Sequence, residues 1–238
     1  MFIQKVFNEA KNALTIINNL EQDINNYNTN NCATIKIGSN TSFTKLCLMK
    51  YINEFSLIYP NVRFELNTDT TSNNLKLLQN GLLDMVIAKE PINLDLDFNY
   101  NKIGDTKYIF IANKNLYTKL HQKISLKEIL NYPLLMPKSP SNSFDSINQL
   151  FKKYNLKIDS KINIGSSSLL IDFVKLGNGV GYTTQLYAND ALKNKEIYII
   201  KIAPETPNIS YGIITLKNNI LSYMSSKFMK YIIERKDD

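Results

Sequence analysis

Clusters of serine, threonine and asparagine stand where strand-like sequence gives way to helix-like sequence, at residues 39–42, 70–72, 139–143 and 166–168. The first backbone N–H groups of a helix lack partners within the helix and carry partial positive charge, so they attract carboxylates and other anions. Hydroxyl and amide side chains add further donors and acceptors. The chemistry that these clusters predict is the binding of a small molecule, and an anionic metabolite is one class.

For any one of these residues, the alternative is that its side chain only caps the helix that follows. Four such junctions in one chain favour a ligand site. The candidate contacts from the residues alone are Ser39, Thr41, Ser42, Thr70, Thr71, Asn142, Ser143 and Ser166. Arg63 and Arg235 lie outside the clusters, so an anion is expected to be held by hydroxyls, backbone N–H groups and Lys89 or Lys138.

Catalytic and metal-binding chemistry is not indicated. His121 is the only histidine, and its lysine-containing segment KLHQK predicts a surface position, so Ser-His-Asp or Cys-His catalysis would depend on it alone. The sequence has no GxSxG elbow, HExxH motif or phosphate loop ending in Gly-Lys-Ser/Thr. We therefore predict no catalytic residue, no metal site and no cofactor. An enzyme such as a small-molecule lyase is the weakest alternative.

Two features that look like parts of active sites have structural explanations. The segment GNGVG at 177–181 follows a helical segment and precedes a strand, whereas a dinucleotide fingerprint follows a strand and opens a helix. Gly177 is therefore predicted to end the helix and begin a tight turn. Asp84 stands at the start of a strand without a second carboxylate, and we predict a structural role for it.

The elements that position the clusters alternate between strands and helices. Residues 34–88 read as strand, helix, strand, helix and strand, and the carboxyl ends of such parallel strands meet where α/β proteins bind ligands. Residues 89–105 read as a turn-rich surface segment, and a second set of strands and helices begins near Lys107. IKIGS at 35–39 returns as INIGS at 162–166, which supports two similar α/β units facing each other.

The order of these elements predicts three parts. Residues 31–106 and 208–238 form a first subdomain, residues 107–207 form an inserted second subdomain, and residues 1–30 form a leading helix. In the leading helix, the apolar residues alternate between spacings of three and four positions, as in a coiled-coil seam. They are Ile3, Val6, Ala10, Ala13, Ile17, Leu20, Ile24 and Tyr27. The helix could instead lie on its own domain, but the polar linker at 25–31 favours pairing with another chain.

Composition limits the classes of protein. With 238 residues and 44% hydrophobic side chains, the chain can bury a core. No apolar run approaches the roughly 18 residues that cross a membrane. The N-terminus lacks the apolar core of an export signal, and two cysteines outside a CxxC pair suit a reducing cytoplasm. The net charge of +7 comes from scattered lysines, so we predict no nucleic-acid surface on these residues.

Over nearly its whole length the chain resembles the effector-sensing part of LysR-type transcriptional regulators. The matching segments, in order, are TIKIGSNTSF, YPNVRFEL, LLQNGLLDMVIA, SLKEILNYPLLMP and FVKLGNGVGYTT. The YP-x-V-x-x-x-L and L-x-x-G-x-L-D patterns are the most specific of these segments. The occurrence of all five segments in the family's order strengthens the resemblance. The winged helix-turn-helix with which this family reads DNA has no counterpart in these residues, so DNA contact is expected only through such a domain.

The resemblance implies an α/β fold of two Rossmann-like subdomains joined by two crossover strands, like type II periplasmic binding proteins. It also implies a small-molecule effector in the cleft between the subdomains, and a homodimer or homotetramer paired through the leading helix. Effector contacts of the family map to Ser42, Thr70, Thr71, Asn142, Ser143 and Phe144. The alternative on the same fold is a solute-binding protein of a transporter, which the heptad helix and the missing signal disfavour.

Overall fold

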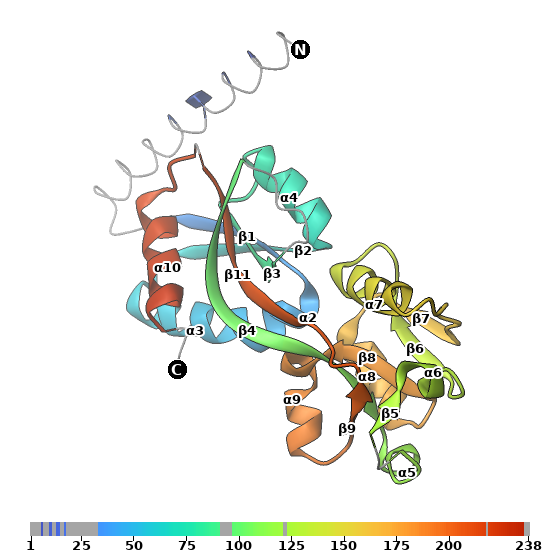
Figure 1. The fold of residues 1–238 in the computed structure, drawn as a ribbon. Helices are drawn as coiled ribbons and strands as arrows, with labels where there is room; N and C mark the ends of the chain where they lie inside the picture. Colours follow the sequence, from blue (N-terminus) through green and yellow to red (C-terminus); the bar gives the residue numbers. More distant parts are fainter. Residues whose placement is uncertain are drawn as a thin grey trace. The chain divides into compact units, whose positions relative to one another are not determined.

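The computed structural model describes Val6, Ala10, Ala13, Leu14, Ile17 and residues 33–90, 97–120, 123–217 and 219–235. These residues form two compact units (Figure 1). The first unit holds the described residues as far as Gly104 and from Ser210 onward, and the second holds those of Asp105–Ile209. Two long strands, β4 and β11, contribute residues to both units and are neighbours in the sheet.

The first unit is a mixed sheet with helices. Its elements are β1 (Thr34–Ser39), α2 (Thr41–Phe43), a π-helix (Thr44–Leu48), α3 (Met49–Ile58), β2 (Arg63–Thr68), α4 (Thr71–Gln79), β3 (Met85–Lys89), the start of β4 (Phe98–Ala112), most of β11 (Asn208–Leu216) and α10 (Tyr223–Glu234). β1 pairs in parallel with both β2 and β3, and β11 pairs antiparallel with β3. The order of strand, helix, strand, helix and strand that was predicted for residues 34–88 is thereby confirmed.

Burial explains why these segments fold as they do. Ile35 and Ile37 alternate along β1 and are fully buried, whereas every residue of β3 is buried, as expected for a central strand. On the helices, Phe55 of α3 is buried and its ring lies 5.0 Å from that of Phe228 on α10. This pair joins α3 to α10.

The second unit repeats the strand order of the first: a central strand pairs in parallel with a strand on either side, and one of those two pairs antiparallel with a long strand. Its elements are the rest of β4, α5 (Lys114–Tyr117), β5 (Ile124–Ser125), α6 (Leu126–Ile129), β6 (Leu134–Pro137), α7 (Asn142–Lys153), β7 (Ile162–Ile164), α8 (Ser167–Lys175), β8 (Val180–Thr184), α9 (Gln185–Lys193), β9 (Tyr198–Ile200) and β10 (Ile202–Ala203). β6 pairs in parallel with β7 and β8, and β4 pairs antiparallel with β8 and β9.

The sequence prediction was wrong in three places. Residues 98–105, expected in a surface loop, belong to β4, where Phe98 and Ile103 are buried. Residues 114–117, expected partly as strand, form α5, and residues 185–193, for which no element was predicted, form α9. The error in β4 has a clear cause: its partner β11 lies far away in sequence, so its turn-rich local composition does not reveal the pairing.

Several local predictions are confirmed. Gly177 follows α8 with a φ of 82°, and its N–H donates to the Val174 carbonyl at 2.9 Å. Asp84 has a structural role: its carboxylate accepts from the Lys36 N–H at 2.8 Å and from the Ser225 hydroxyl at 3.0 Å. Burial raises the pKa of Asp84 above its ordinary value. Asp84 therefore ties β1 and α10 to the start of β3.

The leading helix is described at only five positions. Val6, Ala10, Ala13 and Ile17, four of the predicted seam residues, are helical and exposed. The other seam positions, His121 and Cys32 lie outside the described residues. Across the described ranges, none of the helices has the length and apolar character needed to cross a membrane.

Candidate functional site

The first unit has a polar edge where β1, β2 and β3 end. Ser39, the last residue of β1, pairs with Thr68 of β2 and with Ile87 of β3. The loops after β1 and β2 therefore leave the sheet side by side, as expected at the carboxyl ends of parallel strands. We call these loops and the starts of α2 and α4 the first polar edge.

The side chain of Asn74 in α4 links the loops of this edge by hydrogen bonds. Its side chain is fully buried, and its Nδ2 donates to the carbonyls of Ser39 and Asp69, both at 3.2 Å. Its Oδ1 accepts from Asn67 Nδ2 at 2.7 Å. Because Ser39 ends β1 and Asp69 follows β2, one amide fixes both polar loops relative to each other.

The predicted contacts of this edge differ in what their side chains do. The buried Ser39 hydroxyl donates to the Ile87 carbonyl at 3.0 Å, so the sheet already uses it. The Thr70 hydroxyl caps α4 by accepting from the Asn73 N–H at 3.3 Å. Thr41 is exposed, Ser42 is buried within α2, and Thr71 is half-buried in the first turn of α4.

Lys89 adds a buried cation near this edge. It is the last residue of β3, is only 7% exposed, and stands opposite Tyr211 of β11. The Tyr211 ring meets Phe43 of α2 edge-on at 5.2 Å. Burial disfavours the ammonium and lowers the pKa of Lys89 to about 8. The sequence named Lys89 as one of two lysines for an anion, and the other, Lys138, is exposed.

The low pKa of Lys89 predicts a pH dependence of stability. Below pH 8 the folded chain keeps a buried ammonium. Between about pH 8 and pH 10.5, the ordinary pKa of lysine, Lys89 has lost its proton in the folded chain but keeps it in the unfolded chain. The free energy of unfolding therefore rises with pH over this range. We expect Lys89→Met to raise the free energy of unfolding at pH 7 by about 2 kcal/mol and to remove this rise.

Urea unfolding at pH 7 and pH 9.5 measures both effects. Lys76→Met, at an exposed position of α4, is the matched control and should keep the pH dependence of the parent chain. Equal pH dependence in the parent and in Lys89→Met would show that Lys89 does not titrate in this range.

The second unit has its own polar edge, at the ends of β6, β7 and β8. Pro137, which ends β6, pairs with Ile164, which ends β7, and β8 runs parallel beside β6. α7 and α8 therefore begin at one edge of this sheet. We call the starts of these two helices and the end of β8 the second polar edge.

Buried polar groups without partners distinguish this second edge. Asn142 Nδ2, Thr183 Oγ1 and Thr184 Oγ1 are buried and find no hydrogen-bond partner among the described residues. Such groups are rare because an unmade hydrogen bond of a buried donor costs about 1–3 kcal/mol. Thr184 is the last residue of β8 and Asn142 is the first of α7, so both stand where a ligand could supply the missing partner.

A pair of stacked tyrosines lies behind the start of α7. The Tyr108 and Tyr182 rings are 5.0 Å apart and nearly parallel. The Tyr182 hydroxyl is 3.2 Å from the Ser146 hydroxyl, and Ser143 is a hydrogen-bond partner of Tyr108. Burial raises the pKa of Tyr108 to about 12 and also raises that of Tyr182, so both phenols stay protonated at neutral pH.

The predicted contacts of the second unit lie at this edge. Asn142, the buried Ser143 and the half-buried Phe144 form the first turn of α7, and Ser141 caps it by accepting from the Phe144 N–H at 3.2 Å. Ser166 caps α8, and its hydroxyl is 2.9 Å from that of Ser168. Each polar edge therefore groups the predicted residues of its own unit.

Sequence reasoning missed Asn74, Thr183 and Thr184 as polar residues of the two edges. The signal for the threonines was present, because the predicted strand VGYTT ends in two hydroxyl-bearing residues. Nothing local distinguishes Asn74 from Asn73, which is exposed on the same helix. Within the described ranges, no group of three or more potential metal ligands occurs. Burial raises the pKa of the half-buried Cys47 thiol to about 11.

Comparison with known proteins identifies one family that matches most of the chain. The family described as LysR substrate binding domain matches residues 28–237. HTH-type transcriptional activator CmpR of Synechocystis sp. (strain ATCC 27184 / PCC 6803 / Kazusa) is 24% identical over 232 residues, which cover 96% of this chain and 75% of CmpR. HTH-type transcriptional regulator cbl of Escherichia coli (strain K12) is 23% identical over 185 residues, and the match spans 76% of this chain and 55% of that protein.

Solved structures share the fold at low sequence identity. The CcmR regulatory domain of Synechocystis PCC6803 in complex with 2-PG has a TM-score of 0.78 at 17% identity, and the match covers 87% of this chain and 98% of that one. The effector binding domain of QuiR in complex with shikimate has a TM-score of 0.72 at 15% identity, over 84% and 95% of the two chains. The chain belongs to the LysR substrate binding domain family, the ligand-binding part of LysR-type transcription regulators, with the fold of type II periplasmic binding proteins.

Proposed function

We propose that this chain senses a small-molecule effector that binds between its two units and contacts both polar edges. The observation that carries the proposal is the unpaired Asn142 Nδ2 and Thr184 Oγ1, because a bound ligand would supply the hydrogen-bond partners that these two buried atoms lack. The candidate contacts are Ser42 and Thr71 on the first edge and Asn142, Ser143 and Thr184 on the second. Ser39, Thr41, Thr70, Phe144 and Ser166 shape the same edges.

The ligand we propose is an anion with hydroxyl groups. The helix starts at both edges supply backbone N–H groups with partial positive charge, and Lys89 adds an ammonium near the first. Hydroxyl-bearing side chains suit ligand hydroxyls, which both donate and accept. The ligands named for the two structural relatives, 2-PG and shikimate, are natural first probes.

We further propose that the effector acts by changing how chains of a homodimer or homotetramer pair. Exposed apolar residues support self-association, since such side chains gain by burial against a partner. Leu57 of α3 and Leu176, which directly follows α8, are each 78% exposed, and Val6 and Ile17 of the leading helix are about half exposed. The effector shifts the arrangement of the units only as far as its affinities for two arrangements differ.

Alanine variants at the two edges test the site. A calorimetric screen of small carboxylates and phosphate esters, starting with 2-PG and shikimate, should yield a ligand. We expect Thr71→Ala and Ser143→Ala each to weaken its affinity about tenfold, since a lost hydrogen bond to a charged ligand is worth about 1.5 kcal/mol or more. Light scattering on the same samples should report a dimer or tetramer.

Ser72→Ala is the matched control, because Ser72 is exposed and follows Thr71 in α4. Its affinity should equal that of the parent chain. A confirmed ligand that binds all three variants as tightly as the parent would place the effector elsewhere. A monomer at every concentration would contradict the self-association.

A further inference from the structure

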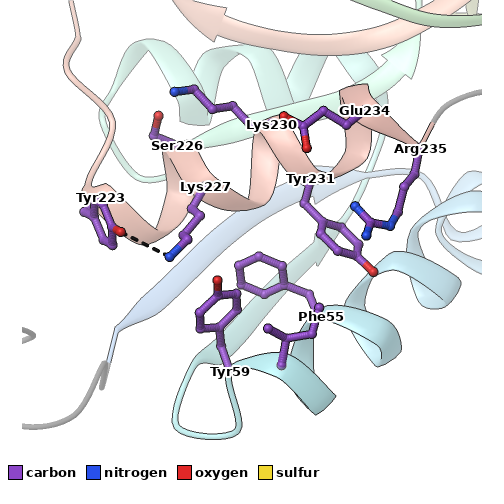
Figure 2. A pocket seen from close by; sticks show the side chains of 10 residues that line it. Phe55, Tyr59, Tyr223, Ser226, Lys227, Lys230, Tyr231, Glu234 and Arg235 are labelled. Carbon is purple, nitrogen blue, oxygen red and sulfur yellow. Dashed lines mark hydrogen bonds between the residues drawn. The ribbon is translucent and has the colours of Figure 1, made fainter.

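The first unit contains a groove between α3 and α10, with a volume of about 510 Å³ (Figure 2). This volume falls in the range of small-molecule sites. The groove is distinct from the first polar edge. A continuous helical run from Thr41 to Ile58 begins at that edge and ends at the groove. The length of this run places the groove about 25 Å from the edge.

Aromatic rings form the wall of the groove. The buried Phe55 ring lies 4.6 Å from the Tyr59 ring and 5.4 Å from the Tyr231 ring. The Tyr231 hydroxyl donates to Glu54 Oε2 at 3.1 Å, which fixes the ring. Tyr223 stands at the start of α10 and is 56% exposed. Rigid rings of this kind offer apolar contact with little loss of side-chain entropy.

Lys227 is held in place inside this wall. Its Nζ lies 4.7 Å from the centre of the Tyr59 ring and 5.0 Å from that of Tyr223, and it donates to the Tyr223 hydroxyl at 3.1 Å. These hydrogen bonds and ring contacts favour the charged form, and they raise the pKa of Lys227. The ammonium is thereby oriented before any ligand arrives.

Arg235 provides a second oriented cation. Its guanidinium lies 4.0 Å from the centre of the Tyr231 ring, and Figure 2 shows Lys227, Tyr231 and Arg235 extending from α10 toward α3. A guanidinium stacked by its face keeps its edge for a carboxylate or phosphate, which it binds with two parallel hydrogen bonds.

The charge of the groove is unbalanced. Among the described residues that line it, three carry a positive charge, Lys227, Lys230 and Arg235, and Glu234 carries a negative one. None of these three cations forms an ion pair with a carboxylate of the described residues. Lys227 and Arg235 are eight positions apart on α10, or about 12 Å along its axis, with Tyr231 between them.

We propose that the α3–α10 groove binds a small anion that has an aromatic body, with its acid group on Arg235 and its ring near Lys227 and Tyr223. The acid is a phosphate ester or a carboxylate, which a guanidinium recognises by the same two hydrogen bonds. This site is additional to the proposed effector site and does not depend on it.

Two anions and their uncharged counterparts test this site by NMR of the full chain labelled with ¹⁵N. We expect adenosine 5′-monophosphate, 2-naphthoate or both to shift the amides of Tyr59, Lys227 and Arg235, and we expect adenosine and 2-naphthalenemethanol not to. Arg235→Lys and Lys227→Gln should each lower the affinity for the anion at least about tenfold. Lys76→Gln removes the same charge from exposed α4 and should leave the affinity unchanged.

The outcomes separate this proposal from its rivals. Binding of only one anion supports the site and identifies the acid as phosphate or carboxylate. Equal shifts by the anions and the uncharged compounds would overturn it, as would shifts confined to Ser42, Thr71 or Ser143, which would leave the effector site intact. Groove amides that move with protein concentration instead of ligand would show that a second copy of the chain occupies the groove.

Discussion

Asn74→Leu is expected to lower the free energy of unfolding by about 3 kcal/mol, because it removes a buried amide that makes three hydrogen bonds. Leucine has the same branched arrangement of side-chain heavy atoms and leaves no cavity, so the loss comes from the unpaired partners. The carbonyls of Ser39 and Asp69 and the amide of Asn67 would lose their partner in Asn74. The two loops of the first polar edge would then no longer be held together.

Urea unfolding measures the change, and Asn73→Leu is the matched control. Asn73 precedes Asn74 in α4 but is exposed, and its Nδ2 donates to the exposed carboxylate of Asp69. We expect a change of less than about 1 kcal/mol there. Any ligand of the effector site should also bind Asn74→Leu more weakly. Equal losses of stability in both variants would show that the buried network does not organise this edge.

Gly179→Ala is the second large effect, with an expected loss of at least about 3 kcal/mol. Gly179 has a φ of 152°, which other residues rarely adopt, and an added Cβ would lie 2.2 Å from the Pro133 carbonyl oxygen. That oxygen accepts from the Val180 N–H at 2.8 Å, the bond with which β8 begins to pair with β6. An alanine methyl would have to displace backbone at the start of this pairing.

Gly165→Ala is the control within the same unit. Nothing lies within 4 Å of a Cβ added at Gly165, which stands between β7 and α8. Its stability should stay within about 0.5 kcal/mol of the parent chain. Thermal or urea unfolding of both variants compares them directly, and a small effect at Gly179 would mean that the turn before β8 relaxes at little cost.

The sequence predicted elements well where the pattern is local. Strands such as Met85–Lys89 are short apolar runs, and helices such as Asn142–Lys153 show apolar spacing of three and four after a capping serine. Residues 98–105 were assigned wrongly because a strand rich in Asn, Gly and Asp is stable only through its pairing with β11. Helix Gln185–Lys193 was missed because Asn189 and Asp190 interrupt a weak apolar face.

The candidate site shows the same limit at the level of single side chains. The sequence alone determined that hydroxyl-rich segments follow strands in both halves of the chain, because strand and helix periodicity and capping chemistry are local. Only the tertiary structure decided which of these groups are already used. The Ser39 hydroxyl donates to the carbonyl of Ile87, far away in sequence, whereas the buried atoms Asn142 Nδ2 and Thr184 Oγ1 find no partner among the described residues. Whether a side chain has a hydrogen-bond partner depends on residues that are distant in sequence and close in space. The local sequence pattern therefore could not predict which groups lack one.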